Sequence, residues 1–308
     1  MRKTLLASLA SLALWSHCAI AAVINFEVQF TPFVGDLAMS QVQTVPGKAF
    51  IYLNNVPVAE QDVEKKNVPV LFDNREIAAA VWVPVKSLGG LVRKGKNTVR
   101  IEFVPTDAKA SYQSRLQWNE VTDQVKEQRS GGAVSSTNRG GEGMETKKIQ
   151  GKVVLERDFT GDFATDLPWH KYPSVSAVSD EDKQKLVALI KDRAEAFKPN
   201  FDGIYKILGA KPEIQVAEIR KVGCLEKAHA AGVRVPVPEA ADLEFATTGS
   251  AAVVVGRKSG WLYPFDEKAF ARLKGEQLQM CAGIALSVAY PPRLVVAKTP
   301  DGRWEVVF

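Results

Sequence analysis

Histidine, cysteine and paired carboxylate side chains carry most acid–base, nucleophilic and metal chemistry in proteins. This chain of 308 residues contains three histidines and three cysteines. Beyond the first 21 residues the histidines are His170 and His229. His229 lies in a Lys-Ala-His-Ala-Ala-Gly segment, without a second histidine at metal-ligand spacing. We therefore expect His229 to be a surface histidine or one whose hydrogen bonds are satisfied within the fold.

The motifs of the common catalytic and cofactor sites are absent from the sequence. It has no Gly-x-Ser-x-Gly elbow, no His-Glu-x-x-His pair, no Walker loop, no dinucleotide-binding glycine fingerprint and no Cys-x-x-Cys pair. Aspartate and glutamate are so numerous that the two carboxylates of a glycosidase cannot be singled out. The sequence therefore leaves any catalytic residues unknown and predicts neither a metal site nor a cofactor.

The densest group of chemically useful side chains is Leu-Pro-Trp-His-Lys-Tyr-Pro at residues 167–173. Aromatic faces with polar tips suit the binding of sugars or peptides, which makes Trp169, His170 and Tyr172 candidate binding residues. The alternative is structural, because the segment lies where the sequence pattern changes from strand to helix. In that case Trp169 and Tyr172 fill the junction between two domains.

The first 21 residues have the three parts of a secretory signal peptide. Arg2 and Lys3 supply the positive start, Leu5 to Trp15 is apolar, and Ala19-Ile20-Ala21 fits a cleavage site. The apolar run is too short for a membrane-spanning anchor. The residues before Cys18 are Trp, Ser and His, unlike the small residues of a lipoprotein site. We expect cleavage after Ala21 and export to the bacterial periplasm.

Cleavage would leave Cys224 and Cys281 as the cysteines of the exported chain. In an oxidising compartment an isolated pair predicts a disulfide, the alternative being two buried free thiols. The net charge is +5 for the whole chain and +3 once Arg2 and Lys3 are removed. Such a small excess does not indicate a nucleic-acid partner, and no later segment is apolar enough for a transmembrane helix.

The chain from residue 22 to about 165 has the pattern of an antiparallel β-sandwich. Short alternating or apolar runs occur at residues 25–30, 49–53, 78–85, 98–104, around 116–118, and at 148–159, with Asn54-Asn55 as turn residues. Residues 129–145 contain five glycines and few apolar side chains. They predict a flexible hairpin loop within the sandwich, or alternatively an interdomain linker.

Two segments resemble the jelly-roll, galactose-binding-like β-sandwich modules that are attached to glycoside hydrolases. One is Phe50 to Val58 (FIYLNNVPV) and the other is Leu91 to Ile101 (LVRKGKNTVRI), whose Gly95 and Asn97 match the turn of that pattern. The sequence departs from the pattern at Asn55, where glycine is usual. The resemblance implies a fold, and such modules often bind sugars.

The chain from residue 166 to 308 is predicted to be an α+β domain, two helices followed by an antiparallel sheet. Ser179 is a good N-cap for a helix with apolar residues from Leu186 to Phe197, and Phe201 to Leu208 follows as a second helix. After the helices the sequence has a weak strand pattern at 214–216 and further strand patterns at 232–237, 251–255, 261–263, 294–297 and 304–308. Residues 211–231 also fit a helical period. The order is faintly similar to cystatin-like folds.

Two functions of different classes are consistent with these features. The first is a non-enzymatic periplasmic binding or envelope-associated protein, whose partner is an envelope protein or a glycan. The second is a hydrolase acting on glycan or peptide, with the sandwich as an accessory module. The absence of a catalytic motif favours the first.

Overall fold

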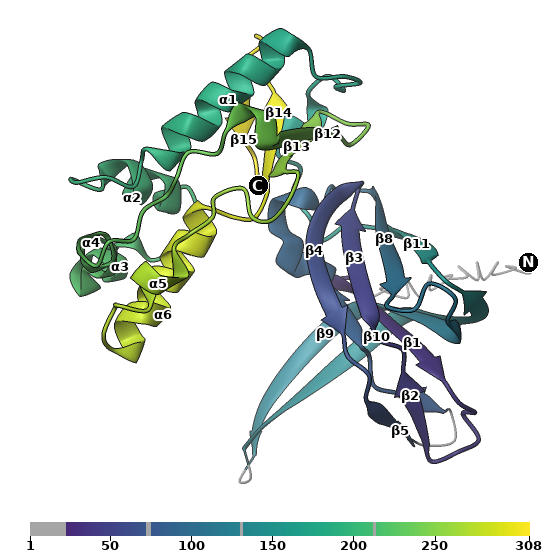
Figure 1. Ribbon diagram of the computed structural model, residues 1–308. Coiled ribbons are helices and arrows are strands. Elements are labelled where there is room, and N and C mark those ends of the chain that lie inside the picture. Colours follow the sequence, from purple (N-terminus) through teal and green to yellow (C-terminus); the bar gives the residue numbers. More distant parts are fainter. Residues whose placement is uncertain (1–22, 72–74, 130–131, 212–213) are drawn as a thin grey trace, which may run out of the picture.

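The computed structural model describes residues 23–71, 75–129, 132–211 and 214–308, and of residues 123–140 and 267 only the backbone. The predicted signal peptide at residues 1–21 lies outside the described residues. Figure 1 shows strands β1–β11 in one part of the molecule and the helices α1–α6 together in another. No described helix is long and apolar enough to cross a bilayer.

The strands of the N-terminal part form two antiparallel sheets. The first sheet has the order β10-β9-β1-β2-β5-β6, with β7 also paired to β1, and the second has the order β11-β8-β3-β4. Their bounds are β1 Asn25–Val34, β2 Gln41–Thr44, β3 Gly47–Leu53, β4 Val56–Val63, β5 Asn67–Leu71, β6 Glu76–Ile77, β7 Val81–Pro84, β8 Lys96–Pro105, β9 Ser111–Arg129, β10 Gly132–Gln150 and β11 Val153–Thr160. A 3₁₀ segment, η1, spans Val85–Leu91.

The two sheets pack face to face through side chains of alternating position, as a sandwich requires. Phe26, Val28 and Phe30 of β1 are buried against Ile51 of β3 and Phe103 of β8. The rings of Phe30 and Phe103 lie 5.5 Å apart. The period-2 pattern in the sequence therefore predicted the sandwich core correctly.

Within the described part of residues 129–145, Arg129 ends β9 and residues 132–145 lie in β10, so the prediction of a flexible loop there was wrong. β10 pairs with β9 from Gly132↔Arg129 to Gln150↔Ser111. The pairing satisfies the backbone hydrogen bonds of a segment that has few apolar side chains to bury. Beyond Val121, β9 pairs only with β10 in the described part of the chain, and Figure 1 shows this two-stranded ribbon projecting from the sandwich.

The single strand predicted at residues 148–159 is two strands in different sheets. β10 ends at Gln150 in the first sheet and β11 begins at Val153 in the second. Gly151 between them has φ +72°, and an added Cβ would lie 2.8 Å from the carbonyl oxygen of Ala108. Only glycine meets both conditions, which is why the chain can change sheets at this residue.

The C-terminal part is built from a third antiparallel sheet, β12-β13-β14-β15, and the helices. The helices are η2 Pro168–Lys171, α1 Asp180–Ala194, α2 Asp202–Gly209, α3 Val216–Val222, α4 Cys224–Ala230, η3 Ala240–Asp242, α5 Glu267–Phe270 and α6 Glu276–Ala289. The strands are β12 Leu243–Thr247, β13 Ala252–Arg257, β14 Leu294–Lys298 and β15 Trp304–Val306.

Helices thus lie both before and within the sheet, instead of two helices preceding it. Residues 216–230 are helical, so the weak strand predicted at 214–216 was wrong. The predicted strands at 232–237 and 261–263 are irregular backbone. β13 pairs instead with β12 and β14. The predicted N-cap is present, since the Ser179 hydroxyl accepts from the backbone N–H of Asp182 at 3.1 Å.

The two central strands of the third sheet, β13 and β14, are buried on both faces. Ala252, Val254 and Val295 belong to the same apolar cluster as the sandwich core. Val253 and Val255, which alternate with them, pack in the second cluster with the helices. A strand that is covered on both faces has a continuous run of apolar residues in its sequence, and residues 251–255 are such a run.

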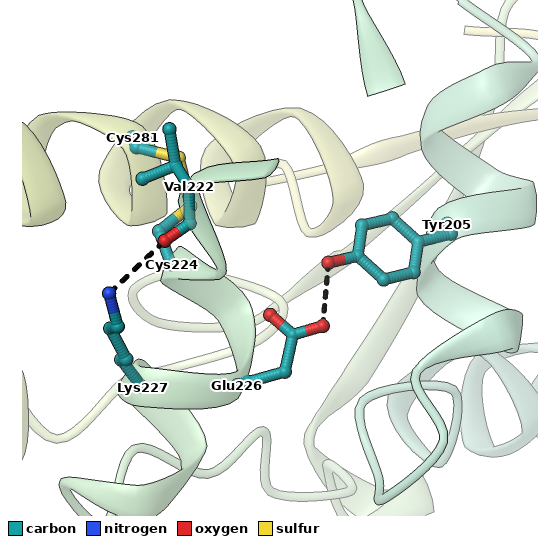
Figure 2. The surroundings of a disulfide bond; sticks show 6 residues. All are labelled: Tyr205, Val222, Cys224, Glu226, Lys227 and Cys281. Atoms are coloured by element: carbon teal, nitrogen blue, oxygen red, sulfur yellow. Dashed lines mark hydrogen bonds between the residues drawn. A yellow bond between two sulfur atoms is a disulfide. The ribbon is translucent and has the colours of Figure 1, made fainter. Parts of the chain in front are cut away.

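Cys224 of α4 and Cys281 of α6 form the predicted disulfide, with their Cα atoms 6.1 Å apart (Figure 2). Cys224 is fully buried. Beside it Tyr205 donates a hydrogen bond to Glu226 at 2.8 Å, and Lys227 donates to the carbonyl of Val222 at 3.2 Å (Figure 2). The disulfide therefore joins α6 to α4, two helices that are separated in the chain by β12 and β13.

Candidate functional site

Two adjoining cavities of ≈ 550 and ≈ 710 Å³ lie between β3–β4 of the sandwich and the third sheet. Both are lined by Pro57, Ala59, Glu244 and Arg293, and together we call them the seam groove. Its walls come from segments about 190 residues apart in the chain, which are held together by a hydrogen bond from Asn55 Nδ2 to the carbonyl of Thr248 at 3.3 Å.

The sandwich wall presents aromatic rings because of the alternation along β3. Ala49, Ile51 and Leu53 point into the core, so Phe50 and Tyr52 point outward into the groove, where both are half-buried. These two rings supply apolar faces on a polar wall.

A guanidinium group lies on one of these rings. Arg100 of β8 is the cross-strand partner of Tyr52, and its guanidinium carbon lies 4.0 Å from the ring centroid. Its Nη1 also contacts Glu102 at 2.8 Å. Stacking and ion pairing fix the orientation of Arg100 before any ligand arrives.

The opposite wall brings a carboxylate and a second guanidinium together at a glycine. An added Cβ at Gly256 would lie 3.4 Å from Glu244 Oε1 and 3.5 Å from Arg293 Cγ, so both side chains pass over this residue. Arg293 reaches across the groove to Glu60 of β4, with an N–O distance of 3.9 Å. That contact is long for an ion pair and leaves the guanidinium able to bind another anion.

Cationic side chains outnumber anionic ones in the groove. The described lining residues include the basic residues Lys48, Arg100, Arg193, Lys211, Arg257, Lys258 and Arg293 and the acidic residues Glu60, Asp62 and Glu244. Lys48 lies 2.6 Å from Glu60 and 3.6 Å from Asp62 and so offsets part of the negative charge. Glu102 pairs with Arg100 at 2.8 Å and Asp242 with Arg257 at 3.5 Å, so five carboxylates offset part of the charge of the seven basic side chains. The groove keeps a smaller positive charge that attracts anions.

Two of these cations are held by neutral partners. Arg193 Nε donates to the carbonyl of Ala289 at 2.8 Å, and Lys258 Nζ donates to the carbonyl of Ala241 at 2.7 Å. A carbonyl orients a cation without cancelling its charge. Burial lowers the pKa of Arg193, since the low-dielectric surroundings disfavour the charged form; a bound anion would relieve that cost.

The structure places the predicted binding residues at the junction of the sandwich and the third sheet, outside the seam groove. Trp169 is 4% exposed and belongs to the sandwich cluster, with the Arg93 guanidinium 5.8 Å from its ring. Tyr172 is half-buried against the same cluster. Burial and then the carboxylate of Glu305 on β15 raise the pKa of Tyr172. These positions agree with the alternative given above, in which Trp169 and Tyr172 fill a junction and do not bind a ligand.

His170 is engaged by backbone groups on both ring nitrogens. Its Nδ1 accepts from the N–H of Leu167 at 3.2 Å, and its Nε2 lies 2.8 Å from the carbonyl oxygen of Gly90. Both bonds are satisfied when the proton is on Nε2, and Nδ1 also lies 3.5 Å from Oδ1 of Asp166. The side chain is 3% exposed. His170 therefore joins η2 to η1 and is not presented to a ligand.

The other histidine of the described residues, His229, packs edge-to-face against the rings of Phe197 and Phe201, with ring centroids 5.6 Å apart in each pair. Burial lowers its pKa, and the nearby Arg234 lowers it further. Among the described residues, no group of three His, Cys, Asp or Glu side chains is arranged to hold a metal ion.

The groove residues were not identified from the sequence, although one signal was available. Aromatic residues at the outward positions of a strand whose inward positions are already apolar, as at Phe50 and Tyr52, indicate a second surface to cover. We compared the chain with models of known protein families, with curated proteins and with solved structures, and none of them matches it.

Proposed function

We propose that this chain is a non-enzymatic binding protein of the bacterial periplasm, in which a β-sandwich domain and an α+β domain together bind an anionic saccharide in the seam groove. The observation that carries the proposal is the pairing of ring faces with an excess of cations. Phe50 and Tyr52 are half-buried beside Arg100 and Arg293, and seven basic side chains face three acidic ones.

Each part of the groove suits one part of such a ligand. Sugar rings have apolar faces that pack on aromatic side chains, and their hydroxyls exchange hydrogen bonds with polar groups. A carboxylate or phosphate on the sugar fits the planar donors of arginine. The backbone of Thr247, Thr248 and Gly249 at the rim offers further hydrogen-bonding groups.

Titration calorimetry with a charged and a neutral oligosaccharide of equal length tests the proposal. We expect tetragalacturonate to bind, maltotetraose to bind at least tenfold more weakly, and added salt to weaken the first more than the second. Arg293→Gln should weaken tetragalacturonate binding about tenfold, the loss of one charge-assisted hydrogen bond. Arg303→Gln is the matched control, since Arg303 is exposed and pairs with Asp301 at 2.7 Å, outside the groove.

Three results would contradict the proposal. Equal binding of the two sugars would exclude recognition of charge, and equal effects of the two substitutions would place the site elsewhere. Release of reducing ends from tetragalacturonate, lost on Glu244→Gln, would instead make the chain a hydrolase.

The proposed location has a separate test. Protein isolated from the periplasm should have the intact mass of a chain that begins at Ala22, because the predicted cleavage follows Ala21. A lipid-modified species that begins at Cys18, or a full-length mass, would contradict it.

A further inference from the structure

A further cavity, of ≈ 440 Å³, lies on the surface of the helical part. Its walls are the rings of Trp261, Phe265 and Phe270 and the α6 residues Gly283 and Leu286, together with Ala271, Gln279 and Ser287. We call it the α6 pocket. Phe265 is anchored by the ring of Tyr290, 6.0 Å away, so part of the wall is fixed by the core.

The two polar side chains of the α6 pocket are already committed to the fold. Gln279 Nε2 donates to the carbonyl of Leu273 at 2.7 Å, and Ser287 Oγ donates to the carbonyl of Ile284 at 3.0 Å. The side-chain donors of Gln279 and Ser287 are therefore already used in hydrogen bonds to backbone carbonyls of the protein. The pocket offers aromatic and aliphatic surface to an occupant, and only an apolar occupant gains from that surface.

Large apolar side chains that line the pocket, or that follow its lining residues Gln279 and Gly283 on α6, are exposed. Trp261 is 49% exposed, and Met280 and Ile284 on α6 are 60% and 52% exposed. A cluster of large apolar side chains left in water around a concavity marks a binding surface.

The α6 pocket adjoins the seam groove at Trp261. Trp261 lines both cavities, and Val288 of the groove follows Ser287 of the pocket on α6. At this boundary Arg257 and Lys258 line the groove, and Arg257 Nη1 donates to the carbonyl of Trp261 at 3.4 Å. Arg257 and Lys258 therefore lie at the boundary between the cationic seam groove and the apolar α6 pocket.

Because the two cavities adjoin at Trp261, we infer that the saccharide of the seam groove carries an apolar chain, which lies in the α6 pocket, so that the ligand is an anionic glycolipid bound one molecule at a time. This inference rests on the proposed function. The sugar head of the ligand would contact the cations of the groove. The junction between head and chain would pass Trp261, and the apolar chain would cover Phe270 and Leu286. The charge change along the path favours such an amphiphile over a wholly apolar or a wholly polar ligand.

Three probes separate the contributions of head and chain: methyl glucuronide, decyl glucuronide and decyl glucoside, each below its critical micelle concentration. Each methylene that leaves water is worth roughly a factor of four in affinity. Burial of only three methylenes should make decyl glucuronide bind on the order of 50-fold more tightly than methyl glucuronide. Decyl glucoside should bind at least tenfold more weakly than decyl glucuronide.

A substitution at Gly283 can fill the pocket from within. An added Cβ there would lie 3.5 Å from the ring of Phe270, an ordinary contact, and leucine is a better helix former than glycine. Gly283→Leu should remove most of the advantage of the decyl chain, and Gly283→Ala, the matched control, should keep most of it. The midpoint of thermal unfolding checks that both variants fold.

The outcomes distinguish the two proposals. If methyl glucuronide binds and the decyl chain adds nothing, the chain assignment is wrong and the groove proposal stands. If decyl glucoside binds as tightly as decyl glucuronide, the pocket takes a chain but the anionic groove is wrong. A brominated decyl chain should quench the fluorescence of Trp261, so Trp261→Phe should abolish the quenching and Trp82→Phe, at a residue 56% exposed, should not. Quenching that survives Trp261→Phe would also refute the inference.

Discussion

Asp182 is the residue whose replacement tests most directly how the helical part is fixed to the third sheet. It lies in the first turn of α1 and is 5% exposed. Its Oδ1 accepts from Trp304 Nε1 at 3.0 Å, and its Oδ2 accepts from Lys298 Nζ at 2.8 Å and Ser179 Oγ at 3.0 Å. One carboxylate thus joins α1 to β14 and β15.

Asp182→Asn keeps the shape but supplies one acceptor oxygen instead of two, and its amide N–H groups would face a donor. A hydrogen bond to a charged group contributes about 1.5–3 kcal/mol. The Lys298 side chain is 34% exposed, and water screens that pair. We therefore expect a loss of about 2 kcal/mol in the free energy of unfolding at pH 7.

The effect should depend on pH in a defined direction. Burial alone would raise the pKa of Asp182, but the hydrogen bonds from Lys298, Trp304 and Ser179 outweigh it and hold the pKa below its ordinary value. A carboxyl with a depressed pKa stabilises the fold fully above its unfolded pKa of about 4 and loses this contribution as the pH falls through the folded pKa. The difference between Asp182→Asn and the parent should be constant from pH 5 to 7 and shrink below pH 4.

Urea unfolding followed by tryptophan fluorescence at pH 7, 5 and 3 measures the difference. Asp180→Asn is the control, because the Asp180 side chain is 91% exposed and pairs with Lys183 one turn away; its unfolding midpoint should hardly change. An Asp182→Asn midpoint equal to that of Asp180→Asn would refute the anchoring role. A difference that stays constant down to pH 3 would refute the charge argument.

Three further substitutions have definite expectations. Cys281→Ala opens a disulfide that spans 57 residues and should cost roughly 4 kcal/mol in the chain-entropy model; thermal unfolding with and without reductant checks this, and a variant as stable as the oxidised parent would contradict it. Gly283→Ala should stabilise α6 by about 0.5–1 kcal/mol, and a lower urea midpoint would mean that the Phe270 ring cannot tolerate the methyl group. Asn97→Ala removes a buried side chain that accepts from Arg93 N–H and donates to two carbonyls and should cost about 2–4 kcal/mol; calorimetric unfolding at an unchanged temperature would refute it.

The N-terminal sheets could be predicted because strands such as β3 and β8 bury one face, which leaves a period of two in the sequence. The Asn54-Asn55 turn was also readable, since both residues adopt positive φ, 51° and 65°, and asparagine tolerates that region. The β9–β10 ribbon could not be predicted in this way. It is held by backbone pairing, and backbone pairing leaves no hydrophobic period.

The C-terminal part was harder to predict because α6 and α3 lack the usual contrast between faces. α6 has buried Ala282 and Leu286 but also exposed Met280 and Ile284, so its apolar residues do not form one stripe. In α3 no residue is fully buried. The disulfide was predictable from a different kind of information, the number of cysteines and the expected compartment.

The candidate site was the least predictable feature, and the reason is geometric. The junction residues Trp169, His170 and Tyr172 are close together in sequence, which made them conspicuous, yet Trp169 is buried in the sandwich core and both ring nitrogens of His170 contact backbone groups. The groove residues are single positions on separate elements: Tyr52 and Arg100 meet through strand pairing, whereas Arg293 comes from the connection between α6 and β14, almost 200 residues later. A surface assembled from outward positions of distant strands has no local sequence pattern. Only the pairing and the packing of the third sheet bring those charges and rings to one place.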